Sequence, residues 1–317
     1  VLYNAMDCNG YPRYWHGYLA FLKPLMIVLS YSQIRYLYMI LYMMLFAAVV
    51  MKLAKTINTA AAYTWTISLV MAYFVILPFS LQYSSVFLLM FIAMLRLNKI
   101  YHGFDWKQMG IFFLIIGMLT SYLDFLTAPL ITLGMPLVYL ILLQQKQYGD
   151  ESFYRNIYSI GINSFLWGVG YLGNWAAKWG LASIVLGKNV IADGLSQGFN
   201  RVGGIEDQTS IPGAVAYNLF AIIPPGIEGQ DLKWFVVACV VILIILLILF
   251  LRFRTSRKTI ISQIPLLVMA CYPYMWYIVM SNHSQIHYIF TYRIQIIAIW
   301  AGLMMYIQSI QCRGEKR

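Results

Sequence analysis

The sequence carries little charge. Only 10% of its 317 residues are Asp, Glu, Lys or Arg, whereas about a quarter of the residues of a soluble domain are charged. Hydrophobic residues make up 61% of the chain, and its mean hydropathy is +0.71. This composition excludes an ordinary soluble domain and predicts a polytopic membrane protein.

Several enzyme motifs are missing. The chain has no Gly-Lys-Ser/Thr phosphate loop, no Gly-x-Ser-x-Gly nucleophile elbow and no His-Glu-x-x-His helix, which argues against a nucleotide enzyme or a protease of these classes. The four cysteines lack metal-ligand spacing, and Cys239 and Cys271 lie in apolar segments, so a disulfide framework is not expected. No cofactor motif or metal-ligand set is found, although a divalent metal is left open as a cofactor.

Apolar runs predict an all-α fold, a polytopic transmembrane helix bundle with about nine spans. A hydrocarbon core about 30 Å thick requires roughly 20 helical residues. The predicted spans are residues 33–51, 63–80, 84–94, 109–119, 128–143, 157–173, 234–251, 260–280 and 287–310. In the sixth span, close helix approach is expected at Gly161, Gly168, Gly170 and Gly173.

The remaining segments complete a single transmembrane domain, residues 1–317. Residues 1–32 are predicted to be an outer interfacial segment, and residues 174–232 a long outer loop. Within that loop, residues 179–190 are predicted to form an interfacial helix. Because the chain starts with Val1, we expect its natural N-terminus, with a further span, to lie upstream.

The net charge of +11 is explained by the positions of the basic residues relative to the membrane, and it does not indicate nucleic-acid binding. If the C-terminus is cytoplasmic, the short inner segments and the tail hold fourteen of the 22 basic residues, in accord with the positive-inside rule. We therefore expect a multi-pass protein of the plasma membrane, in bacteria the cytoplasmic membrane, with no nucleic-acid partner. The same orientation places Asp124 and the turn 281–286 on the outer side.

Asp124 interrupts an apolar stretch, residues 109–143, that would form roughly 52 Å of helix and is too long for one span. Pro129 and Pro136 favour a break there. A carboxylate between two segments that are apolar enough to enter a membrane costs free energy and indicates a functional acid. Asp124 is therefore the first catalytic candidate. The alternative is that Asp124 caps the second helix by accepting N–H bonds near Thr127.

Two further clusters are expected on the outer side. His283 and His287 are four residues apart, and Arg293 lies inside an apolar helix, where it needs an anionic partner. These three are candidate phosphate-binding residues, although a polar turn followed by a helix start also explains the histidines. At the N-terminus, Arg13 is a further phosphate-binding candidate, with Asp7 and His16 as candidate catalytic groups.

The pattern resembles the GT-C superfamily of polytopic membrane glycosyltransferases. The matching features are Tyr11 to Ser30, similar to the end of that family's first outer loop, and the outer-facing Asp124 and Arg293. The resemblance implies a polyprenyl-phosphate-linked sugar donor, contact with membrane lipid, and a glycan or lipid acceptor in cell-envelope synthesis. The family's usual catalytic carboxylate follows its first span, a region that we expect upstream of Val1.

Two other function classes fit part of the pattern. A broken helix with an acid at the break is typical of substrate sites in transporters, so a transporter or a lipid-linked sugar flippase is one alternative. The other is a non-catalytic partner in a polysaccharide assembly complex. The glycosyltransferase is the leading hypothesis because acid, arginine and histidine residues converge on one side of the membrane.

Overall fold

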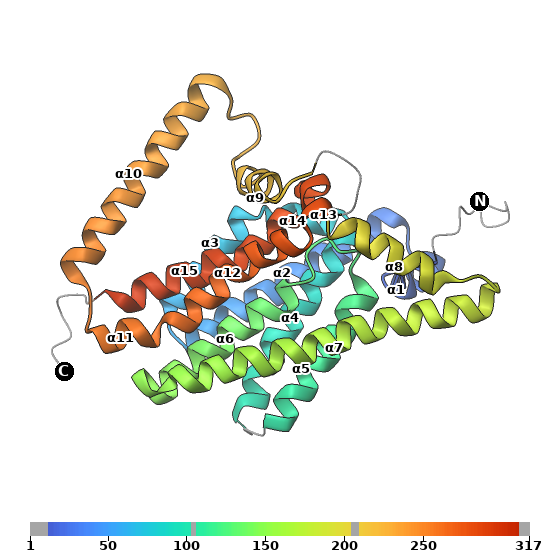
Figure 1. The fold of residues 1–317 in the computed structure, drawn as a ribbon, viewed down its shortest axis with the longest axis horizontal. Coiled ribbons are helices and arrows are strands. Elements are labelled where there is room, and N and C mark those ends of the chain that lie inside the picture. Colours follow the sequence, from blue (N-terminus) through green and yellow to red (C-terminus); the bar gives the residue numbers. More distant parts are fainter. Residues whose placement is uncertain (1–11, 103–105, 204–208, 311–317) are drawn as a thin grey trace.

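The computed structural model describes residues 12–102, 106–203 and 209–310. Within these ranges the regular structure is helical, and an isolated bridge joins Arg254 to Ile310. The helices form one elongated bundle from which a single helix stands apart (Figure 1). Asp7, one of the predicted acids, lies outside the described residues.

Five helical stretches in the described residues are long and apolar enough to cross a membrane. They are α2 (Tyr31–Thr56), α4 (Leu81–His102), α10 (Gly229–Phe253), α11 with α12 (Arg257–Ser262, Ile264–Val279), and α14 with η3 and α15 (Tyr288–Thr291, Tyr292–Gln295, Ile296–Ser309). These helices confirm the all-α class and fit a multi-pass membrane protein.

Each of the other four predicted spans also contains a helix, although the span predicted at residues 63–80 extends past the end of its helix at Met71 into a turn and a short 3-10 helix. These helices are α3 (Thr59–Met71), α5 (Trp106–Leu123), α6 (Ile131–Tyr148) and α7 (Phe153–Leu186). They do not meet the same limits, because α3 and α5 are short and because α6 and α7 carry amide and glycine residues. Nine crossings are therefore not confirmed.

Helix α6 is the centre of the bundle. Every residue from Ile131 to Gln145 is buried, because α4, α5, α7, α12 and α15 surround this helix. Pro136 lies inside α6 and does not end it. The break between α5 and α6 instead falls at residues 124–130, where the sequence places Asp124 and Pro129.

Helices α5 and α7 pack with their backbones in contact. A Cβ added at Gly170 would lie 2.1 Å from the carbonyl oxygen of Leu114, and one at Gly117 would lie 2.1 Å from that of Trp167. The expected close approach is therefore confirmed at Gly170. It is wrong for Gly161, Gly168 and Gly173, since nothing lies within 4 Å of their Cβ positions.

The turns gather at two ends of the bundle (Figure 1). At one, here called the Asp124 end, the backbone N–H of Gly17 donates to the carbonyl of Tyr122 at 3.0 Å. Here lie η1 (Phe74–Phe79), α1 (Leu19–Val28), α8 (Val190–Arg201), α9 (Ile211–Phe220) and α13 (Ser281–Ile286). At the other, the Arg254 end, Lys146 Nζ donates to the carbonyl of Thr56 at 2.8 Å, near η2 (Gly149–Ser152).

The described parts of the predicted loop, residues 174–203 and 209–232, consist largely of helices. Helix α7 continues to Leu186, thirteen residues beyond the predicted end of the span at Gly173. Asn174 does not stop the helix, because its side chain donates to the carbonyl of Met118 at 3.1 Å and ties α7 to α5. The interfacial helix predicted at residues 179–190 is instead the last part of α7, and the separate amphipathic helix is α8, which begins at Val190.

Candidate functional site

Asp124 lies in the loop that joins α5 to α6, and its side chain is only 3% exposed. Its Oδ1 accepts hydrogen bonds from the Thr127 hydroxyl and from the backbone N–H groups of Thr127 and Ala128, the latter two at 3.3 and 3.4 Å. Asp124 therefore caps the start of the next segment, as the alternative interpretation predicted. Its Oδ2 is buried and has no hydrogen-bond partner among the described residues, so half of the carboxylate is left for another role.

Burial raises the pKa of Asp124 from 3.8 to about 6, although the hydrogen bonds from Thr127 and Ala128 act in the opposite direction. An acid whose pKa is raised on folding binds protons more tightly in the folded state, so its charged form disfavours folding. We expect the free energy of unfolding to rise by about 1 kcal/mol through this group between pH 7 and pH 5. Thermal unfolding of the detergent-solubilised chain at both pH values measures the change.

The same measurement on Asp124→Asn isolates the contribution of Asp124, because the asparagine does not titrate. Burial also lowers the pKa of His283 to about 3, which makes folding less favourable below about pH 6.5 and works against the effect of Asp124. That contribution is present in both proteins and cancels in the comparison. An equal pH dependence in the two proteins would contradict an acid with a raised pKa.

His283 joins the Asp124 loop to α8. Its Nε2–H donates to the carbonyl of Leu126 at 2.8 Å, and its Nδ1 accepts from Arg201 Nη1 at 2.6 Å. These two bonds require the neutral ring, in agreement with the low pKa that burial and the neighbouring Arg201 produce. Leu126 is held at a positive φ of 64°, which turns its carbonyl within the loop.

Arg201 carries a positive charge that has no carboxylate partner among the described residues. Among the described residues, no carboxylate oxygen lies within ion-pair distance of its guanidinium, and its hydrogen-bond acceptor is the neutral ring of His283. The ring of His287 lies 4.7 Å from that of His283. An arginine held by a neutral acceptor keeps its attraction for an anion, because guanidinium groups bind carboxylates and phosphates in charge-assisted hydrogen bonds.

Arg201, His283 and His287 line one polar pocket of about 180 Å³. Thr127, which donates its hydroxyl to Asp124, lines the same pocket. The remaining walls are mostly aromatic: Tyr14, Gln82, Tyr83, Phe125 and Phe290. The arginine and histidine side chains supply hydrogen-bonding nitrogens within rigid walls, an arrangement suited to a small anionic group such as a phosphate.

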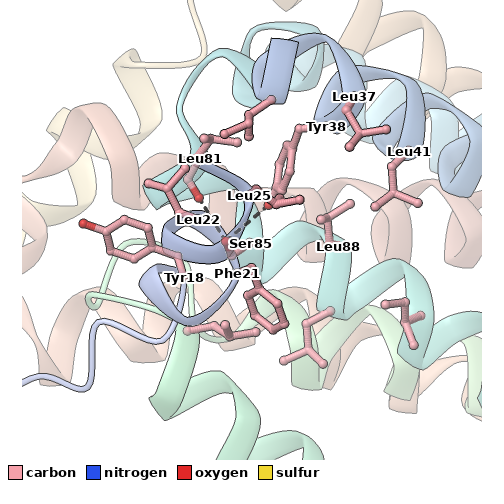
Figure 2. Close-up of a pocket in the computed structure, with 14 residues that line it drawn as sticks. Tyr18, Phe21, Leu22, Leu25, Leu37, Tyr38, Leu41, Leu81, Ser85 and Leu88 are labelled. Atoms are coloured by element: carbon pink, nitrogen blue, oxygen red, sulfur yellow. Dashed lines mark hydrogen bonds between the residues drawn. The ribbon is translucent and has the colours of Figure 1, made fainter. Parts of the chain in front are cut away.

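An apolar groove of about 360 Å³ lies between α1, α2 and α4. Figure 2 shows Phe21, Leu25, Leu41 and Leu88 among the side chains around this space. The main polar contact is between the hydroxyls of Tyr38 and Ser85, 3.2 Å apart, so their polar atoms are already paired. Such a surface suits a hydrocarbon chain.

The groove and the polar pocket are neighbours. Tyr18 lines the groove, and its ring centroid lies 5.7 Å from that of Phe125, which lines the polar pocket. On α4, Leu81 lines the groove while the next residues, Gln82 and Tyr83, line the pocket. A single molecule with an anionic head and a hydrocarbon tail can therefore contact both.

The structure places the other predicted residues outside this pocket. Arg13 forms an ion pair with Asp193 of α8 at 2.6 Å. His16 has a positive φ of 55° and contacts the carbonyl of Tyr14 through Nδ1 at 3.1 Å. Arg293 donates to the carbonyl of Ile289 at 2.7 Å and lies 4.8 Å from the ring of Tyr292. The pocket thus unites the Asp124 loop with His283 and His287, but not with Arg293, Arg13 or His16.

Arg201 is the functional candidate that the sequence did not reveal. It follows Gln197-Gly-Phe-Asn200 in a stretch that reads as polar loop, and its partner His283 is 82 residues away in sequence. The structural reason for its position is that α8 folds back from α7, with Trp179 packed under Gly194, where a Cβ would lie 2.6 Å from the indole. Asn282 Nδ2 then donates to the carbonyl of Asn200 at 2.7 Å.

Within the described ranges, no three His, Cys, Asp or Glu side chains lie close enough together to hold a metal ion. Comparison with known proteins finds no matching family model, no matching curated protein and no matching solved structure.

Proposed function

We propose that this chain is a membrane glycosyltransferase that takes its sugar from a polyprenyl-phosphate-linked donor, in the synthesis of a cell-envelope glycan. The observation that carries the proposal is that Arg201, which has no carboxylate partner among the described residues, lines a polar pocket beside an apolar groove. The donor phosphate would bind Arg201 and the two histidines, while the polyprenyl chain would lie along α1, α2 and α4.

In this proposal Asp124 is the catalytic base. Its Oδ2 lacks a partner, and a pKa of about 6 leaves the carboxylate mostly ionised near neutral pH while keeping it a better proton acceptor than an ordinary aspartate. It would accept the proton of the acceptor hydroxyl as that oxygen attacks the sugar. Arg201 would hold the departing phosphate and stabilise its charge. Thr127 connects the acid with the pocket.

We further propose that the Asp124 end faces outward in a nine-span arrangement. Basic residues gather on the opposite, Arg254 end, at the helix termini there: Lys52, Lys55, Arg96, Lys99, Lys107, Lys146, Arg155, Arg252, Arg254, Arg257 and Lys258. By the positive-inside rule this end is cytoplasmic. The donor would then be bound from the outer leaflet.

The test is sugar transfer by the purified full chain in liposomes. A panel of polyprenyl-phosphate-linked sugars, each labelled in the sugar, is supplied with a cell-envelope extract as acceptor. We expect one donor to be consumed and its label to appear in the acceptor fraction, and Asp124→Asn to lose this activity because it removes the base. Asp231→Asn, an equal change at an exposed position in the first turn of α10, is the matched control and should retain activity.

Two results would contradict the proposal. Transfer that continues at the same rate in Asp124→Asn would remove Asp124 from the chemistry. Movement of the labelled lipid between leaflets without any transfer of sugar would instead favour a transporter or flippase that uses the same binding surface.

A further inference from the structure

A line of buried polar side chains follows one face of α7. Their spacing of three or four residues keeps them on the same side of the helix, and each is at most 5% exposed. The line consists of Ser152, at the start of the helix, and then Asn156, Ser159, Asn163, Trp167 and Tyr171. It runs from the Arg254 end to the Asp124 end of the bundle, and we call it the α7 seam.

Polar groups of α5 and α6 face this seam. Gln144 Nε2 donates to Ser159 Oγ at 3.0 Å. Closer to Asp124, Trp167 Nε1 donates to Thr132 Oγ1 at 3.2 Å, and Thr132 is 2.7 Å from the hydroxyl of Thr120. All of these partners are fully buried, so the seam passes through the interior of the bundle and does not face lipid.

Several polar atoms of the seam have no hydrogen-bond partner within the part of the chain that the structure describes. They are Ser152 Oγ, both amide atoms of Asn156, Nδ2 of Asn163 and the hydroxyl of Tyr171. A buried polar atom without a partner costs about 1–3 kcal/mol, and folded proteins commonly satisfy such groups with internal water. Unpartnered atoms that recur along successive turns of one helix face therefore indicate a hydrated path.

Each end of the seam has an acid. At the Arg254 end, Asp150 accepts hydrogen bonds from Ser262 at 3.3 Å and Thr259 at 3.4 Å, and it is not fully buried. At the other end, Tyr171 lies within electrostatic range of Asp124, Tyr14 and Arg201. Asp124 Oδ2 has no hydrogen-bond partner in residues 12–102, 106–203 and 209–310. Other ionisable groups also lie beside the Asp124 loop. His283 donates to the carbonyl of Leu126, the ring of His16 lies 5.0 Å from that of Phe125, and Arg201 and His287 share a pocket with Phe125 and Thr127.

We propose that the α7 seam holds a file of water molecules that conducts protons between the two ends of the bundle. Water carries the proton from site to site, while the hydroxyl and amide groups hold the file in place. Each proton taken up by the Asp124 carboxylate is passed on, and one proton leaves the opposite end for each that enters. No oxidant or reductant is needed. The proposal does not depend on glycosyl transfer.

The test is proton flux through the full chain in liposomes that contain a pH-sensitive dye. A potassium gradient with valinomycin supplies the driving voltage. We expect the wild-type chain to acidify or alkalinise the lumen, according to the sign of the voltage, faster than protein-free liposomes. Asn163→Leu fills the middle of the seam with an apolar side chain, so its flux should fall to the protein-free level. Asn163→Ser, which keeps a hydroxyl and leaves room for water, should retain flux.

Asn98→Leu is the matched control, because Asn98 is a buried asparagine of α4 that bonds Tyr139 and lies off the seam. Its flux should equal that of the wild type. If Asn163→Leu does not elute as a folded protein, Asn156→Leu tests the same path two seam positions nearer the Arg254 end. Wild-type flux no faster than in protein-free liposomes would overturn the proposal, and so would equal flux in the wild type and the folded leucine variant of the seam.

Discussion

Replacement of Gly170 by alanine is expected to push α5 away from α7 and to lower the free energy of unfolding by about 3 kcal/mol. The added Cβ would lie 2.1 Å from the carbonyl oxygen of Leu114 and 3.1 Å from the N atom of Met118. Both are backbone atoms of α5, so no side-chain rotation relieves the clash. The whole helix must shift, and the Asp124 loop that follows α5 would shift with it.

Gly173 supplies the matched control for this change, because it lies on the same helix and nothing is within 4 Å of its Cβ position. Gly173→Ala should leave stability unchanged or raise it by about 0.5–1 kcal/mol, since alanine favours the helix over glycine. Thermal unfolding of both variants in detergent, followed by circular dichroism, makes the comparison. Equal melting temperatures for the two variants would show that α5 and α7 do not approach as closely as described.

Replacement of Arg201 by glutamine is expected to weaken the binding of polyprenyl phosphate by about 10- to 100-fold. A hydrogen bond to a charged group contributes about 1.5–3 kcal/mol, which corresponds to a change of this size in Kd. The loss should be large because Arg201 is the one arginine that lines the polar pocket. Glutamine preserves a polar side chain, so the substitution mainly removes the charge.

Binding is best measured by titrating the purified full chain with undecaprenyl phosphate in detergent and following native mass spectra. Undecaprenol, which has the same chain without the phosphate, should bind the wild type and Arg201→Gln equally, because the groove is unchanged. Arg252→Gln removes an arginine at the opposite end, in the last turn of α10, and should bind the phosphate like the wild type. Equal binding of the phosphate by Arg201→Gln and the wild type would rule out Arg201 as its ligand.

Much of the helical layout could be predicted from hydropathy. Most of the predicted spans fall on single helices, because a helix that lies among apolar neighbours must itself be apolar along its length. The clearest exception is the span predicted at residues 63–80, since α3 ends at Met71 and the remainder forms a turn and η1. The end of α7 could not be predicted in the same way. Glycine and asparagine at positions 173 and 174 indicate a helix end, but the contact of Asn174 with Met118 keeps the helix intact. That contact depends on how α5 and α7 pack, and hydropathy gives no information about this packing.

Only part of the candidate site could be predicted from the sequence. Asp124, His283 and His287 stand out because polar residues interrupt apolar sequence, and the structure brings their segments together through Leu126. The capping interpretation of Asp124 is confirmed by its bonds to Thr127 and Ala128. Arg201 carries no comparable signal, since basic residues are common in polar stretches. Its position depends on the fold of α8 against α7, which is a tertiary contact.

Helix α10 differs from the rest of the protein because its side chains take almost no part in internal packing. None of its residues is buried, while its two ends are held elsewhere, by the bonds of Asn218 in α9 to Ser284 and by the Arg254–Ile310 bridge. Exchanges among Val, Ile and Leu along its length therefore leave nearly every internal contact as it was, whereas the same exchanges in α6 would open voids or create overlaps on all sides. The two helices thus stand at opposite limits of tolerance to substitution, with α6 restrained by packing on all sides and α10 mainly by the need to remain apolar.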